Sequence, residues 1–432
     1  MPSYASFCKF IAASAVILFP ASVLVMDNLH GLVYLIVVFL GIAHIFTNRK
    51  EVFPLTNEEK LFFFSLSFVM VTVIITTLVN DTNFARADRF LAPVLSISVY
   101  LFFKQYLKNE KYFWVGLVLG SIIAASTAVY QVFFGSNYRA AGTVNPIIFG
   151  DMALLMGAMS LIGIEWFKKQ KHWLVLVPLV AFVCGILASA LSLVRGGWIA
   201  IPFLVVLFIW YFWNRVKIKT ILLGFSLLIL MIGSIYLIPQ TGVSRKIDTS
   251  ITRTIEYFNS KNVNDRSRGT SIGSRLEMWR AAWIIFQESS IFGVGWGEYT
   301  KRVHNLIDLG VVNKSIARFY HPHNQFISAL AKGGVLGFSA IVTLFLIPIV
   351  IFYRVINSTD RKEINLIAFA GLIFIVGFVC FSLTESILER SRSIIFFSFY
   401  LAATMALIHK RDLSVVNEYN SGSRLQKLQV KQ

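Results

Sequence analysis

Residues 174–194 read LVLVPLVAFVCGILASALSLV, and this stretch decides the class of the fold. It holds no charged side chain and is long enough to cross the roughly 30 Å hydrocarbon core of a bilayer as one helix. A segment in lipid must satisfy all of its backbone polar groups internally, which favours a helix. Similar runs recur on both sides of this one along most of the chain. The sequence therefore predicts an all-α polytopic membrane protein.

The composition of the whole chain supports the same class. Of its 432 residues, 56% are hydrophobic and only 14% are charged. A soluble protein of this length cannot bury so much apolar surface. An ordinary soluble enzyme, a disordered regulator and a disulfide scaffold are therefore excluded. The three cysteines lie in or beside apolar runs and form no motif: Cys8, Cys184 and Cys380.

Apolar stretches of spanning or near-spanning length predict about twelve transmembrane helices. They cover 10–26, 31–46, 61–79, 90–103, 113–134, 147–167, 174–194, 199–213, 220–238, 335–353, 364–384 and 394–408. The run 90–103 is short, and we expect it to be tilted, packed inside the protein or extended by its flanks.

These spans divide the chain into four expected parts. Residues 1–238 hold the first nine spans, and residues 335–408 hold the last three. Between them lies a large polar loop domain at 239–334, which we expect to be partly helical. Residues 409–432 form a polar tail.

The short connections between spans carry Lys and Arg unequally, and the richer alternate set should face the cytoplasm. We therefore expect both termini in the cytoplasm and the long segment 239–322 on the outer side. The net charge of +18 would suggest nucleic acid in a soluble chain. Here it first determines topology, and we expect no nucleic-acid partner.

Every basic residue in the short outer connections is an arginine. These residues are Arg86, Arg89, Arg139, Arg195, Arg390 and Arg392. A guanidinium group binds phosphate through a planar fork, whereas Lys is a point charge. We therefore expect an outward-facing site for an anionic, phosphorylated ligand. The alternative for each Arg taken alone is a contact with lipid headgroups.

The long segment contains a second candidate for anion binding. Ser274-Arg275-Leu276-Glu277 has the pattern of a capping box, which predicts a helix over about 274–288. Arg275 would lie in its first turn, where a helix N-terminus and a guanidinium group together can bind an anion. The alternative is an exposed Arg with its charge in water.

Two histidines stand near the end of the segment, in the sequence HPHN at 321–324. Pro favours the first turn of a helix, so we expect a helix to begin here and to run to Lys332. His323 would then lie in the first turn, where the positive helix end favours a neutral imidazole that can act as a general base. A structural role is the alternative. His321 and His323 could also suggest a metal, but no third ligand stands at a suitable spacing, and we expect none.

A transporter is the alternative from another functional class. Proton-coupled transporters depend on acids within the membrane. Asp151 lies near the outer end of its expected span and Glu165 near the inner end, so neither is central. An Arg-lined outer cavity is nevertheless compatible with a transporter or flippase of an anionic lipid-linked glycan.

Three motifs, in this order, resemble those of the O-antigen ligase family. Arg195-Gly196-Gly197 resembles the family's Arg-Gly-Gly segment at the outer end of a span. Ser274-Arg275 with Met278-Trp279 resembles its Arg-bearing helix. His323-Asn324, followed after nine residues by Gly334-Val335-Leu336-Gly337, is similar to its His signature in complete spacing. The resemblance spans most of the chain.

The resemblance implies a GT-C-like frame and an inverting, metal-independent glycosyltransferase without a cofactor. It would act at the periplasmic leaflet of the bacterial inner membrane. The implied donor is a glycan on undecaprenyl pyrophosphate, and the implied acceptor is a sugar hydroxyl of lipid A–core, so that the reaction completes lipopolysaccharide. An O-antigen polymerase, which extends the glycan on its lipid carrier, is the alternative within the superfamily.

The resemblance also implies roles for individual residues. His323 would take the proton from the acceptor hydroxyl, and Arg195 and Arg275 would neutralise the departing diphosphate. Further substrate-binding candidates for the same pocket are His321, Asn324, Arg318, Arg139 and Arg392.

Overall fold

The computed structural model describes residues 4–47, 55–84, 87–213, 226, 243–260, 262–359 and 361–409. All regular structure in these residues is helical, which confirms the expected all-α class. The predicted span at 220–238 (residue 226 apart), Arg86 and the tail after residue 409 lie outside the described residues.

Each predicted apolar run within the described residues overlaps a helix. The helices are α1 (Tyr4–Ser22), α2 (Leu29–Thr47), α4 (Asn57–Val79), α5 (Leu91–Tyr106), α6 (Lys111–Val129), α7 (Pro146–Ile162), α8 (Ile164–Gln170), α9 (Leu176–Leu191), α10 (Ala200–Phe212), α15 (Gln325–Ser358), α16 (Lys362–Ser382) and a last helix, Ser391–His409.

By length and composition, the described residues contain fewer candidate membrane spans than the predicted twelve. Eight helices in the described residues can cross a bilayer alone, or nine if α7 and α8, bent by 48°, form one span. Two further apolar segments are shorter, namely α5 and the stretch Gly196–Phe212. The chain is thus a polytopic helical membrane protein, whereas the count of twelve is not confirmed.

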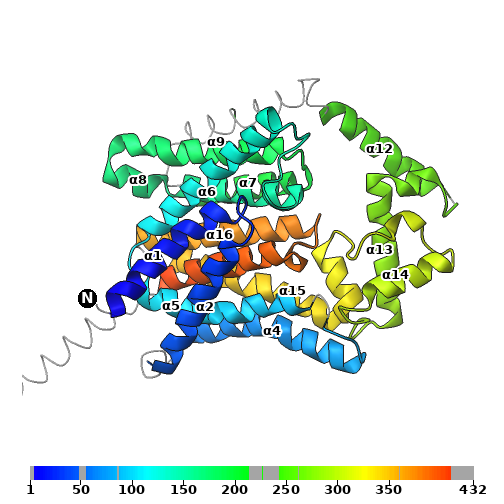
Figure 1. Cartoon of the computed structure of the whole chain (residues 1–432), viewed down its shortest axis with the longest axis horizontal. Helices are drawn as coiled ribbons and strands as arrows, with labels where there is room; N and C mark the ends of the chain where they lie inside the picture. Colours follow the sequence, from blue (N-terminus) through cyan, green and yellow to red (C-terminus); the bar gives the residue numbers. More distant parts are fainter. Residues whose placement is uncertain are drawn as a thin grey trace, which may run out of the picture.

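The core of the bundle is formed by α16 and the last helix, which lie at its centre in Figure 1. In the most apolar 18-residue stretch of each helix, 89% of the residues of α16 and 83% of those of the last helix are buried. Phe374 of α16 packs against Phe396 and Phe397 of the last helix, with ring centroids 5.9 Å apart in each pair. Outer helices instead expose large side chains such as Phe39, as a lipid-facing surface requires. The connection between α16 and the last helix is therefore fixed at both ends by helices of the buried core.

The polar segment forms a helical unit at one end of the bundle, on the right in Figure 1. It contains α12 (Val243–Asn259), α13 (Ser271–Glu288) and α14 (Tyr299–Asp308). Its interior is organised by the buried carboxylate of Glu277, which pairs with Arg268. The same carboxylate accepts hydrogen bonds from the Tyr257 hydroxyl at 2.7 Å and the Asn313 backbone N–H at 2.8 Å.

This use of Glu277 explains why the predicted start of α13 is wrong. The side chain of Thr270 caps the helix by accepting a hydrogen bond from the Gly273 N–H. Ser274 is buried inside the helix, and Glu277 is engaged by the interior of the polar segment instead of closing a capping box. Arg275 therefore lies in the second turn, not at the helix N-terminus.

Helix α15 also begins later than predicted. Asn324 is its N-cap and accepts hydrogen bonds from the N–H groups of Phe326 and Ile327, each at 3.0 Å. His323 therefore precedes the cap and does not lie in the first turn. Its φ of 51° is in the left-handed region, which is uncommon for a residue with a side chain.

A break divides α15 at Gly334, whose φ is 63°. A Cβ there would overlap the carbonyl oxygen of Ile291. The backbone N–H groups that follow the break donate to Ser290 and Ile291, from Val335 at 2.8 Å and Leu336 at 3.2 Å. The break, at the expected domain boundary of 334, thus joins α15 to the connection that follows α13 in the polar segment.

We expect Gly334→Ala to destabilise the protein, because the left-handed backbone disfavours a Cβ by about 1 kcal/mol and the clash with Ile291 adds to this cost. Thermal unfolding of purified protein in detergent measures the effect. Gly310→Ala is the matched control, since Gly310 has a φ of 67° but open space around its Cβ position. Equal unfolding temperatures for the two variants would show that the contact at the break contributes nothing.

Candidate active site

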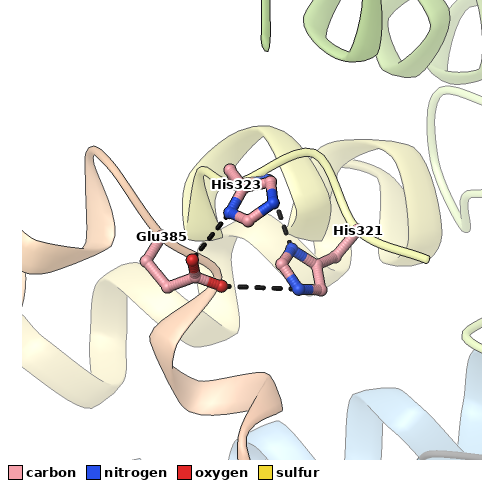
Figure 2. A group of neighbouring side chains, drawn as sticks. All are labelled: His321, His323 and Glu385. Carbon is pink, nitrogen blue, oxygen red and sulfur yellow. Dashed lines mark hydrogen bonds and ion pairs between the residues drawn. The ribbon is translucent and has the colours of Figure 1, made fainter. Parts of the chain in front are cut away.

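His321, His323 and Glu385 form a closed triangle of interactions (Figure 2). His323 Nδ1 lies 2.6 Å from Glu385 Oε2, and His321 Nε2 lies 3.4 Å from Glu385 Oε1. The backbone N–H of His323 donates to His321 Nδ1 at 3.3 Å. Glu385 and His321 are buried, and His323 is partly exposed, so the triangle opens outward through His323.

Glu385, which is 62 residues beyond His323, is not among the residues predicted from the sequence. It follows the end of α16 and lies in the connection to the last helix. The sequence does contain a signal for this residue, because the same short outer connection carries two carboxylates, Glu385 and Glu389, beside Arg390 and Arg392. Carboxylates at a membrane boundary need cationic or donor partners. The two histidines supply them to Glu385, whereas Lys332 and Ser328 supply them to Glu389.

The triangle meets the donor requirement of a metal site. One ligand atom from each residue lies within 4.8 Å of the others, and two imidazoles with a carboxylate suit zinc. However, the same atoms already bond one another, and Arg390 adds a positive charge 3.3 Å from Glu385. Hydrogen bonds and ion pairs therefore account for the geometry, and the expected absence of a metal stays a prediction.

Burial sets the charges of the triangle. It lowers the pKa of His321 to about 2, so this imidazole is neutral at neutral pH. Burial alone would raise the pKa of Glu385. The hydrogen bond from His323 and the surrounding positive charge, including Arg390, outweigh that effect and lower the pKa to about 2. Glu385 is thus ionised over the whole physiological range.

The Arg195-Gly196-Gly197 segment packs against the same region. A Cβ at Gly196 would lie 2.8 Å from the Thr384 hydroxyl, next to Glu385. A Cβ at Gly197 would overlap the buried carboxyl group of Asp151 in α7. Only glycines allow this approach, which brings the half-buried Arg195 to the neighbourhood of Glu385.

Arg275 reaches the region from α13. Its charge interacts with those of Glu385 and Asp151, and its side chain is half-buried. One turn further along α13, Trp279 Nε1 donates to the Pro322 carbonyl at 2.9 Å, which fixes the helix against the histidine segment. Within the described residues, neither the Arg195 nor the Arg275 guanidinium group has a hydrogen-bond or ion-pair partner. Two half-buried guanidinium groups thus have no directly bonded anion in this part of the chain.

Asn324 and Arg318 have other roles in this structure. Asn324 caps α15 and also donates from Nδ2 to the Leu383 carbonyl at 3.0 Å, joining the histidine segment to the Glu385 connection. The exposed Arg318 lies over the ring of Phe319, which contacts the His323 ring edge-on at 5.4 Å between centroids. Arg318 is therefore at the rim of the site.

The remaining two arginine candidates are not brought to the triangle. Arg392 pairs with Asp27 and donates to the Thr143 hydroxyl at 2.6 Å, so it joins three connections of the bundle. Arg139 is exposed in the connection between α6 and α7. In the described part of the chain, no contact joins Arg139 to the two histidines.

Comparisons with known proteins relate the chain to O-antigen ligases. The family model for O-Antigen ligase matches residues 180–342, a range that includes Arg195, Arg275 and His323 but not Glu385. An uncharacterized protein of Haemophilus influenzae is 25% identical over 392 residues, covering 90% of this chain and 96% of the relative. An O-antigen ligase of Salmonella typhimurium is 26% identical over 239 residues, covering 54% of this chain and 52% of that protein. Together with the three motifs, these matches show that the chain is similar to members of the O-antigen ligase family.

Proposed function

We propose that the protein is an inverting glycan ligase of the periplasmic leaflet. It transfers O-antigen glycan from undecaprenyl pyrophosphate to a sugar hydroxyl of lipid A–core. One observation carries this proposal, namely that two half-buried guanidinium groups without a partner in the described residues lie in the region of an imidazole. The similarity to an O-antigen ligase of Salmonella typhimurium supports a ligase.

Arg195 and Arg275 bind the diphosphate of the donor. Negative charge grows on the diphosphate as its bond to the anomeric carbon breaks, and positioned guanidinium groups stabilise that charge most in a site with little water. They come from a segment packed on α7 and from α13, so the diphosphate lies between the bundle and the polar segment.

His323 is the general base. The acceptor oxygen forms a bond to the anomeric carbon as its proton passes to the imidazole, and the bond from that carbon to the diphosphate oxygen breaks. This single displacement inverts the anomeric configuration. His323 suits the role because it is the most exposed member of the triangle.

The orientation follows from the charge pattern of the short connections. The Lys and Arg excess in one alternate set of these connections supports a cytoplasmic position for both termini, and the polar segment with its site would then face the periplasm. The lipid tail of the donor lies against apolar helices of the bundle, where the hydrocarbon region is continuous with the membrane.

We expect His323→Ala to lower ligation by roughly 10²- to 10⁴-fold, because the acceptor hydroxyl loses its base. The measurement is transfer of a defined undecaprenyl-pyrophosphate glycan to purified lipid A–core, with folding checked by thermal unfolding. In cells the variant should leave core without O-antigen. Core that carries one repeat unit would instead indicate a polymerase, and a near wild-type rate would remove His323 as the base.

Arg195→Lys should lower the transfer rate on the order of 10-fold or more, although the charge is kept, since a point charge replaces a planar fork. The control is Arg302→Lys on the exposed surface of α14, where the pair with Glu288 is 3.7 Å long. Full activity of Arg195→Lys would contradict bidentate binding of the diphosphate.

Removal of divalent cations should leave the activity unchanged, because guanidinium groups supply the charge that a metal would supply. The assay compares transfer before and after treatment with EDTA. Loss of activity that zinc or manganese restores would instead identify His321, His323 and Glu385 as a metal centre.

A further inference from the structure

We propose that Glu385 is a positioning residue that fixes which nitrogen of His323 accepts the proton. This inference rests on the proposed function, in which His323 is the base. It concerns a residue outside the matched family range of 180–342.

The proton position on His323 follows from its contact. An ionised carboxylate can only accept hydrogen bonds, so the nitrogen 2.6 Å from Glu385 Oε2 must carry the hydrogen. That nitrogen is Nδ1. In a neutral imidazole Nε2 is then unprotonated, and it is the atom that can take a proton from an acceptor hydroxyl.

The second oxygen of Glu385 is held by other donors. His321 Nδ1 accepts the backbone N–H of His323, so the proton of neutral His321 is on Nε2, which faces Glu385 Oε1 at 3.4 Å. Arg390 also donates to Oε1, from Nε and Nη2 at 3.3 Å each. Arg390 in turn donates to the Tyr320 hydroxyl. The carboxylate therefore cannot rotate without breaking several contacts.

This asymmetry predicts the orientation of an amide at position 385. In Glu385→Gln the carbonyl oxygen would replace Oε1, because His321 and Arg390 both donate there. The amide NH₂ would then face His323 and donate to Nδ1. The imidazole would then have to carry its proton on Nε2. This nitrogen could no longer take the proton of the acceptor hydroxyl.

The order of two variants separates positioning from a structural role. Glu385→Gln keeps the shape of the side chain, whereas Glu385→Ala leaves a cavity and removes the partner of Arg390. A structural role would make the alanine variant the worse enzyme. A tautomer role makes the glutamine variant worse, since a free imidazole exchanges its proton between the two nitrogens.

The experiment measures kcat and KM for ligation by the full-length protein with both variants. We expect kcat to fall by roughly 10³- to 10⁴-fold for Glu385→Gln, as for a base locked in the wrong tautomer, and by about 10- to 100-fold for Glu385→Ala. KM for the donor should change little, because Arg195 and Arg275 are intact. A glutamine variant as active as the wild type, or more active than the alanine variant, would overturn the inference.

Nitrogen-15 spectra of histidine-labelled protein provide a second readout that does not depend on activity. The His323 signals, assigned by their loss in His323→Ala, should report a protonated Nδ1 in the wild type and a protonated Nε2 in Glu385→Gln. The same tautomer in both proteins would overturn the inference even if activity fell. If Glu385→Gln does not fold, Glu385→Asp should keep the wild-type tautomer with lower kcat, and a protonated Nε2 there would contradict the role.

The two proposals fail in different ways. Full activity of His323→Ala would refute the base itself, and the tautomer of His323 would then have no catalytic meaning. An inactive His323→Ala together with a fully active Glu385→Gln would leave the base in place and refute only the role of Glu385.

Discussion

The structure of the site depends on one buried carboxylate. Glu385 is fully excluded from solvent, and an ionised group in that position is tolerated only when charge and donors surround it. Its partners come from two connections, the histidine segment before α15 and its own connection after α16. Because α16 and the last helix form the core, this carboxylate transfers the rigidity of the core to the imidazoles.

The outer arginines look alike in the sequence, but the structure shows that some are paired with other groups and that others are not. Arg390 and Arg392 are paired with carboxylates, and Arg89 donates to the Glu389 carbonyl, so these three hold connections together. Arg195 is half-buried, and its guanidinium group has no hydrogen-bond or ion-pair partner among the described residues. The identity of Arg indicates a capacity to bind phosphate, but only the absence of an internal partner indicates which Arg is available for a ligand.

The parts predicted from the sequence are those governed by local patterns. Apolar runs identified the helices because each segment in lipid must satisfy its own backbone hydrogen bonds. Resemblance to a family selected Arg195, Arg275 and His323, and the structure brings their segments to one region. Glu385 was missed because its partners are far away in the chain. The start of α13 was wrong because a carboxylate at the spacing of a capping box, Glu277, has stronger partners in the interior of the polar segment.

The same reasoning explains why His323 lies outside the helix that Pro322 seemed to begin. A left-handed backbone at His323 costs about 1 kcal/mol or more for a residue with a side chain, so other contacts must stabilise it. Asn324 supplies the cap, Trp279 holds the Pro322 carbonyl, and the ring of His323 gains a short bond to Glu385. In the first turn of a helix the ring would follow the direction of the helical side chains. The strained turn instead directs Nδ1 toward the core carboxylate, so that the two ring nitrogens have different surroundings.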